Sequence, residues 1–158
     1  MSDSSTAERE IVITRVLKAP RELVFEAWTR PEHVAQWWGP TGFTTTTATM
    51  EVRVGGSWRF MMHGPDGKDW PNRIDFLEVV RPERLVYDHG DDSESSPHHF
   101  RVWVTFEDAG GGRTLLTMRS MFPTREQRDL VVKEFHAIEG GQQTIGRLEV
   151  FLETFRSR

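Results

Sequence analysis

The chain has 158 residues, a hydrophobic fraction of 37%, a charged fraction of 28% and a net charge of −4. This length suits one domain with one core, and the composition is that of globular proteins rather than disordered or membrane-spanning ones. The absence of cysteine excludes disulfides, thiolate metal sites and a cysteine nucleophile. Because acidic residues outnumber the scattered basic ones, no nucleic-acid partner is expected.

The first part of the chain predicts a polar segment, a strand and two short helices. Residues 1–8 are expected to be flexible, and they lack the basic start and apolar run of a signal peptide, so we expect a cytoplasmic protein without a membrane span. Glu10–Lys18 is rich in β-branched residues and predicts a strand. Pro20 and Pro31 suit the first turns of two helices, the second of which should end near Trp37.

From Phe43 to Arg119, short β-type runs alternate with turn residues, which is typical of an antiparallel meander. Six strands are expected, at residues 43–54, 58–63, 71–80, 85–89, 98–107 and about 116–122. Between the fourth and fifth of them, Gly90–Pro97 is acidic and poor in apolar residues. That stretch predicts a mobile loop.

The last part of the chain, Thr124–Phe155, predicts one long helix that is capped by Thr124. The apolar stripe that contains Val131 and the one that contains Ile145 differ in direction by about a quarter turn. Gly140-Gly141 lies between them, and each glycine inside a helix costs about 1 kcal/mol. We interpret the glycines as a kink in a helix that covers the sheet, within one α+β domain spanning residues 1–158.

Several motifs carry a resemblance to a known family. They are Ala19-Pro20-x-x-x-Val24-Phe25-x-Ala27-Trp28-Thr29-x-Pro31-Glu32, Trp37-Trp38-Gly39-Pro40-x-Gly42-Phe43, Arg53-Val54-Gly55-Gly56-x-Trp58, Pro82-x-Arg84-Leu85-Val86-Tyr87 and Gly141-x-Gln143-Thr144-x-x-x-Leu148. With them the sequence resembles the single-domain proteins named after activators of a heat-shock chaperone ATPase, in the START-like (SRPBCC, Bet v allergen-like) superfamily. The resemblance implies a helix-grip fold, in which a curved antiparallel sheet of about seven strands surrounds a long C-terminal helix and leaves a cavity. Because function varies within the family, the resemblance implies no single activity.

The aromatic and methionine residues of this chain suit a pocket with apolar walls and few polar groups. The candidate lining residues are Trp37, Trp38, Trp58, Phe60, Met62, Ile74, Phe76, Phe100, Val102, Met118 and Phe135. For each of them alone, a plain hydrophobic core is the favoured interpretation, and the pocket is suggested by the set as a whole. The leading hypothesis is binding of a small apolar or amphipathic molecule between sheet and helix, with no cofactor and no metal.

Three polar residues are candidates to face the same cavity. Gln142 shares a helical face with Phe135, and its amide could orient a ligand or cap the broken helix. Glu78 is the second, because the alternation of its strand breaks at Leu77; Asp75 is the third, unless strand parity places it outside. A buried carboxylate has a raised pKa and can act as an acid or base, so cyclase-like or hydrolase-like chemistry with a histidine is an alternative.

Two further features bear on possible partners. Histidines and acids gather around the acidic loop, namely His89, His98, His99, Asp88, Asp91 and Asp92. They could ligate a metal, but their spacing matches no known signature, so a solvated turn is favoured. Trp103 is expected on the outer face of the sheet, where it would anchor a protein in a partner-binding module, the third function class. A homodimer is a further possible assembly of this chain.

Overall fold

A curved antiparallel sheet forms the centre of the protein. The structure, a computed structural model, describes residues 8–91 and 100–156, with the backbone alone at positions 91, 135, 155 and 156. These residues form seven strands in the order β1-β7-β6-β5-β4-β3-β2. The strands are β1 (Glu10–Leu17), β2 (Thr44–Met50), β3 (Ser57–His63), β4 (Asp69–Val80), β5 (Arg84–Asp91), β6 (Phe100–Gly110) and β7 (Arg113–Met121). The predicted strands of the meander are therefore confirmed.

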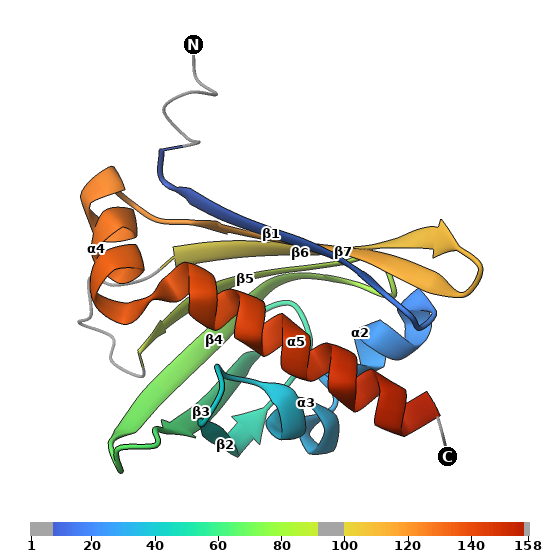
Figure 1. Cartoon of the computed structure of the whole chain (residues 1–158), viewed down its shortest axis with the longest axis horizontal. Coiled ribbons are helices and arrows are strands. Elements are labelled where there is room, and N and C mark those ends of the chain that lie inside the picture. The colour runs from blue at the N-terminus through green and yellow to red at the C-terminus, as the bar shows by residue number, and fades with distance from the viewer. Residues whose placement is uncertain (1–7, 92–99, 157–158) are drawn as a thin grey trace.

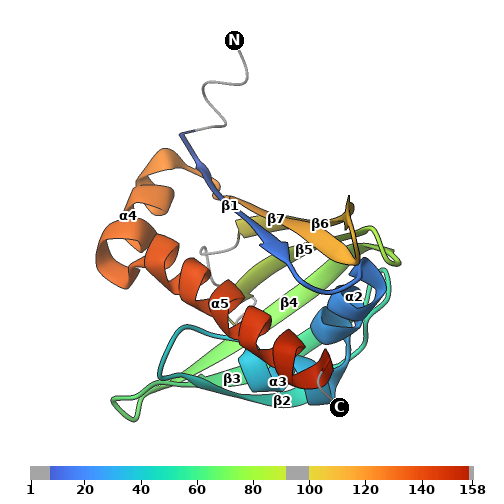
Figure 2. The same cartoon turned by 45° about the vertical axis from the view of Figure 1, so that its right-hand side comes forward.

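Helices lie on the concave side of this sheet. They are α2 (Arg21–Thr29), α3 (Pro31–Trp37), α4 (Arg125–Phe135) and α5 (Ala137–Arg156). Figure 1 shows α5 crossing the concave face, with α2 and α3 beside its C-terminal half and α4 at its other end. The turned view in Figure 2 shows the same arrangement, which is the helix-grip fold that the resemblance implied.

The expected mobile loop does not begin at Gly90. Strand β5 continues through Asp91, because the long strand β4 still offers partners there: Gly90 pairs with Arg73, and Asp91 pairs with Asn72. The rest of that loop and residues 1–7 lie outside the described residues, as do the first two positions of the strand expected from residue 98. The predicted start of the loop was therefore wrong by two residues. Gly90 and Asp91 extend the hairpin of β4 and β5 although neither residue is apolar.

The C-terminal helix is broken at His136 and not bent at Gly140-Gly141. His136 has φ 52° and ψ 47°, the left-handed conformation that ends many helices, and its backbone N–H donates to the carbonyl of Val131. The predicted start is confirmed, because the Thr124 hydroxyl accepts the backbone N–H of Gln127 at 3.1 Å. The apolar stripe therefore changes direction because two helices, α4 and α5, meet at His136.

The two glycines allow α5 to approach its neighbours closely. A Cβ atom at Gly141 would lie 2.4 Å from Cδ1 of Ile13, which is 2% exposed in β1. Real Cβ atoms do not come this close, so the missing side chain lets α5 rest against β1. A Cβ atom at Gly140 would meet Pro40 at 3.7 Å, an ordinary contact.

An aromatic cluster, defined as Trp28, Trp37, Trp38, Trp58 and Phe60, joins the short helices to the sheet. Ring centroids lie 5.0 Å apart for Trp28 and Trp37, and 5.0 Å apart for Trp38 and Trp58. Trp58 and Phe60 stack at 3.9 Å. Helix α5 completes the core with Ile145, Leu148 and Leu152, all of which are buried. The core therefore fills the end of the sheet that α2 and α3 cover.

The packing of the two glycines yields a paired stability prediction. Gly140→Ala should raise the free energy of unfolding by up to about 1 kcal/mol, because alanine favours a helix. Gly141→Ala gains the same helix propensity, but its methyl group overlaps Ile13. The free energy of unfolding of this variant should therefore be about 1–3 kcal/mol lower than that of Gly140→Ala. Urea unfolding of both variants measures the difference. Ile13→Val removes the overlapping Cδ1, so Gly141→Ala should become stabilising in that background; equal effects of the two alanines would contradict this account.

Tyr87, which is the one tyrosine of the sequence, yields a pH prediction. It is 2% exposed on β5, and burial raises the pKa of its hydroxyl group. Below about pH 10 the folded and unfolded states both keep the proton, and above it only the unfolded chain loses it. The free energy of unfolding should therefore fall by about 1.4 kcal/mol per pH unit above that point. Tyrosinate absorbance should appear together with the loss of circular dichroism; its appearance near pH 10 in a folded chain would show that Tyr87 is accessible.

Candidate functional site

A row of side chains crosses the inner face of the sheet from β3 to β6. The strand register pairs Trp58 with Ile74, Ile74 with His89, and His89 with Phe100. Paired residues of antiparallel strands project from the same face. Since Trp58 and Ile74 are buried in the core, His89 and Phe100 project toward the inside as well.

The predicted pocket residues fall into a buried and a partly exposed group. The buried ones are Trp37, Trp38, Trp58, Phe60, Ile74, Phe76 and Val102. Met62, Phe100 and Met118 are only partly buried, although they pack against the same core. The side chain of Phe135 lies outside the described residues. The partly buried residues are thus the ones that a ligand could reach, and their role in binding stays a prediction.

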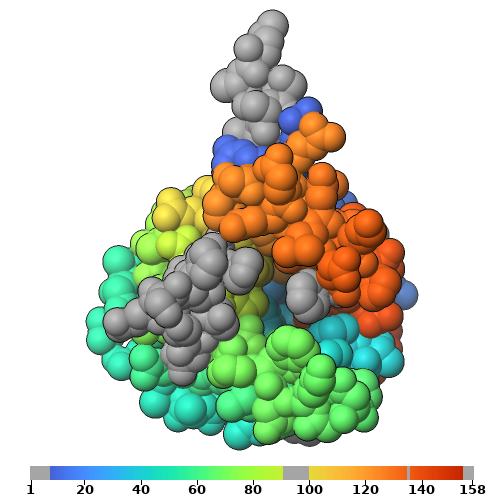
Figure 3. Space-filling view, turned by 90° about the vertical axis from the view of Figure 1, so that its left-hand side faces the viewer, coloured from blue at the N-terminus to red at the C-terminus, as the bar shows by residue number. Residues whose placement is uncertain are grey.

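The end of the molecule that carries α4 is hollowed. Figure 3 shows the hollow between α4, the hairpin of β3 and β4, and the segment that follows α3. In the hairpin, Trp70 pairs with Met62 and is 41% exposed. An aromatic side chain is therefore accessible in one of the elements that border the hollow.

A polar pair interrupts the apolar inner face. The Nε2 atom of His89 lies 2.9 Å from Oδ1 of Asn72, within hydrogen-bonding distance. The imidazole is half-buried among aromatic rings, with its centroid 4.9 Å from that of Phe100, 6.0 Å from Phe60 and 6.2 Å from Trp38. Because polar groups on an apolar wall fix the orientation of a ligand, this pair is the strongest candidate for specificity.

The sequence interpretation placed His89 at the end of the strand 85–89 but considered it only as a metal ligand beside the acidic loop, so it missed the residue as part of the inner face. The signal was present in the strand: Leu85, Tyr87 and His89 alternate with Val86 and Asp88, and Leu85 and Tyr87 are buried on the inner face. Period-two alternation therefore placed His89 inside. The partner Asn72 could not be found in this way, because it depends on the register of β4 against β5.

Glu78 and Asp75 both project away from the inner face of the sheet. The prediction that Glu78 lines the ligand site is therefore wrong, whereas Asp75 lies outside, as strand parity favoured. A register shift between Phe76 and Glu78 turns Glu78 outward, where it is exposed and pairs with Arg84 at 2.9 Å. Asp75 projects from the outer face, and its carboxylate accepts hydrogen bonds from Ser57 at 2.6 Å and from an arginine of the same strand. Acid–base chemistry that uses these two carboxylates inside the cavity is thereby excluded.

Gln142 also lies away from the inner face of the sheet. Its side chain is exposed, and its Oε1 atom accepts a hydrogen bond of 2.9 Å from Nη2 of Arg15 on β1. The prediction assumed one continuous helical stripe with Phe135, but the break at His136 separates the two faces. Gln142 thus ties α5 to the edge strand of the sheet.

The other expectations concern metals, membranes and partners. Across residues 8–91 and 100–156, no group of three or more histidine, aspartate or glutamate side chains could hold a metal ion. His98, His99 and Asp92 lie outside this range, as does the side chain of Asp91. No helix in the described part is long and apolar enough to cross a bilayer. Trp103 is half-buried, and the guanidinium of Arg119 lies 5.1 Å from its ring centroid.

Solved structures share this arrangement. A protein from Arthrobacter aurescens is 26% identical, with a TM-score of 0.87 over 94% of this chain and 88% of its own. A protein from Nitrosomonas europaea is 26% identical, with a TM-score of 0.85 over 96% of this chain and 99% of its own. DynU16, a protein of the dynemicin biosynthetic locus, is 25% identical, with a TM-score of 0.69 over 92% of this chain and 48% of its own.

The family assignment rests on the sequence as well as on the fold. Among curated proteins, none matches this chain. The family described as Activator of Hsp90 ATPase homolog 1-like protein matches residues 18–153, a range that includes all the motifs quoted above. The chain belongs to this family of Activator of Hsp90 ATPase homolog 1-like proteins.

Proposed function

We propose that the protein binds a small, mostly apolar molecule between the inner face of the sheet and helix α5, with a polar group of the ligand at His89 and Asn72. The observation that carries this proposal is the half-buried polar pair on an aromatic wall. Polar groups on an apolar wall can orient a ligand that carries one hydroxyl or carbonyl group.

The graded burial of the inner face supports the same proposal. Phe100 and Met118 remain partly exposed although neighbouring inward side chains are buried, and the face that Figure 3 shows is hollowed. Transfer of apolar surface from water stabilises a complex by about 25 cal/mol per Å². An apolar ligand that covers these side chains would therefore bind mainly through the hydrophobic effect. The neighbour DynU16, from a biosynthetic locus, is consistent with a small-molecule role.

No observation favours the other function classes. The acid–base scheme predicted from the sequence uses Asp75 or Glu78 inside the sheet, but both carboxylates are on the outer face. The family name points to activation of a chaperone, which requires a protein-binding surface. The expected anchor of such a surface, Trp103, is half-buried beside Arg119.

The methionine methyl groups provide a test of ligand binding. Met62 projects inward, while Met61 projects from the opposite face of β3, since Phe60 is inward and side chains alternate. With dodecanoate, naphthalene and 1-naphthol as probes, we expect saturable methyl ¹³C shifts at Met62 and Met118 but not at Met61. Met118→Trp should fill the site and weaken binding at least tenfold, whereas Met61→Trp, the matched control, should leave it unchanged.

The polar pair is tested separately. His89→Leu should weaken 1-naphthol about tenfold relative to naphthalene, because a hydrogen bond to a buried partner is worth about 1 kcal/mol or more. An equal effect on both probes would contradict the role of His89. Absence of methyl shifts at Met62 and Met118 with all three probes would contradict the binding proposal itself.

A further inference from the structure

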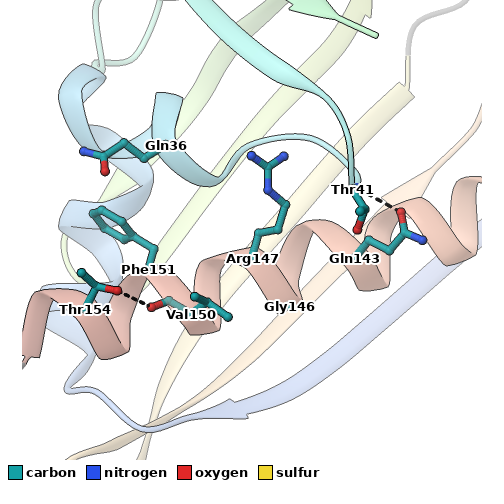
Figure 4. Close-up of a pocket in the computed structure, with 8 residues that line it drawn as sticks. All are labelled: Gln36, Thr41, Gln143, Gly146, Arg147, Val150, Phe151 and Thr154. Atoms are coloured by element: carbon teal, nitrogen blue, oxygen red, sulfur yellow. Dashed lines mark hydrogen bonds between the residues drawn. The ribbon is translucent and has the colours of Figure 1, made fainter. Parts of the chain in front are cut away.

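A second cavity lies on the solvent side of α5. It is a groove of about 520 Å³ between α5, α3 and the segment that joins α3 to β2. Figure 4 shows Arg147 at its middle, with Gln36 and Phe151 toward one end and Thr41 and Gln143 toward the other. Pockets for small molecules have volumes of about 300–1,000 Å³, so the groove is large enough for one.

One nitrogen of Arg147 forms hydrogen bonds with the segment between α3 and β2, which borders the groove. Its Nη1 atom donates to the carbonyl oxygens of the segment after α3, at 2.8 Å for Gly39, 3.1 Å for Phe43, 3.2 Å for Pro40 and 3.4 Å for Trp38. These contacts fix the side chain and aim it across the groove. The position of the guanidinium is therefore set before any ligand arrives.

The remaining edge of this guanidinium has no protein partner. Within residues 8–91 and 100–156, Nε and Nη2 of Arg147 donate no hydrogen bond, and no carboxylate oxygen lies within 4.0 Å of the group. Burial lowers the pKa of Arg147, because the charge is partly withdrawn from water without an opposite charge beside it. A half-buried cation with a free donor edge is an anion-binding group.

We propose that this groove binds a small molecule that carries a carboxylate next to an apolar body. The Nε and Nη2 donors form a planar fork that matches the two oxygens of a carboxylate, and a single positive charge neutralises a monoanion but not a phosphate dianion. Phe151 and the 62% exposed Val150 supply apolar surface in the same groove. This site is separate from the inner face and does not depend on the function proposed above.

Two adjacent glutamines offer matched variants. Gln143 lies one helical turn before Arg147, and its Oε1 atom accepts the backbone N–H of Thr41 at 3.1 Å. Gln143→Glu keeps an acceptor for that bond and adds a carboxylate at the spacing that pairs with an arginine four residues later. Gln142→Glu makes the same charge change at the neighbouring position. The side chain at this position faces Arg15 and not Arg147, so this variant is the control.

The experiment uses the full chain and ¹⁵N NMR with 2-naphthylacetate, 2-naphthylacetamide and inorganic phosphate as probes. We expect 2-naphthylacetate to shift the Arg147 Nε–H and the side-chain amides of Gln36 and Gln143 saturably. The neutral amide and phosphate should bind at least tenfold more weakly, because a hydrogen bond between charged groups is worth about 1.5–3 kcal/mol. Gln143→Glu should weaken the acid at least tenfold, and Gln142→Glu less than about twofold.

Several outcomes would overturn the proposal. They are equal binding of the acid and its amide, binding of phosphate as tight as that of the acid, equal effects of the two glutamate variants, and no shift at the groove. Arg147 would then serve only to hold the segment after α3. Shifts at Met62 and Met118 report the inner face, so failure of the groove and failure of the function proposed above are distinguishable.

Discussion

The packing of Trp38 is the contact on which the rest of the structure depends. Its indole meets Trp28 edge-on at 5.5 Å and Trp58 at 5.0 Å, so it joins the short helices to the sheet. Its carbonyl oxygen accepts hydrogen bonds from the hydroxyl of Thr45 and from Arg147. Edge-to-face aromatic pairs add about 0.5–1.5 kcal/mol each beyond the area that they bury. Trp38 thus connects the inner face with the groove on α5, because its ring packs in the core and its carbonyl oxygen accepts a hydrogen bond from Arg147, which lines the groove.

Much of the fold could be predicted because its signals are local or lie in the motifs of the family. Pro31 is the first residue of α3, as expected for proline in the first turn of a helix, and Pro20 immediately precedes the first residue of α2. Alternation placed Val102, Val104 and Phe106 on the inner face, where all three are buried. The curved sheet around a C-terminal helix came from the resemblance, because neither curvature nor the order of strands follows from hydrophobic periodicity.

The parts that could not be predicted depend on single backbone conformations and on contacts between distant segments. Nothing in the sequence around His136 requires the left-handed conformation, which glycine adopts more readily, and two glycines nearby offered a plausible but wrong kink. The register shift beside Glu78 is a property of two paired strands and not of one. The groove of Arg147 combines α3, α5 and the segment between α3 and β2, so no spacing within one segment indicates it.

The place of β1 in the sheet has a consequence for biosynthesis. β1 pairs along its whole length with β7, and its inner face rests against α5, so its partners lie about a hundred residues later in the chain. During synthesis on the ribosome, β1 therefore remains unpaired until β7 and α5 have been synthesised, which is most of the chain. A domain closed by such distant contacts has a high contact order, and it is expected to fold more slowly than a helical bundle of the same length.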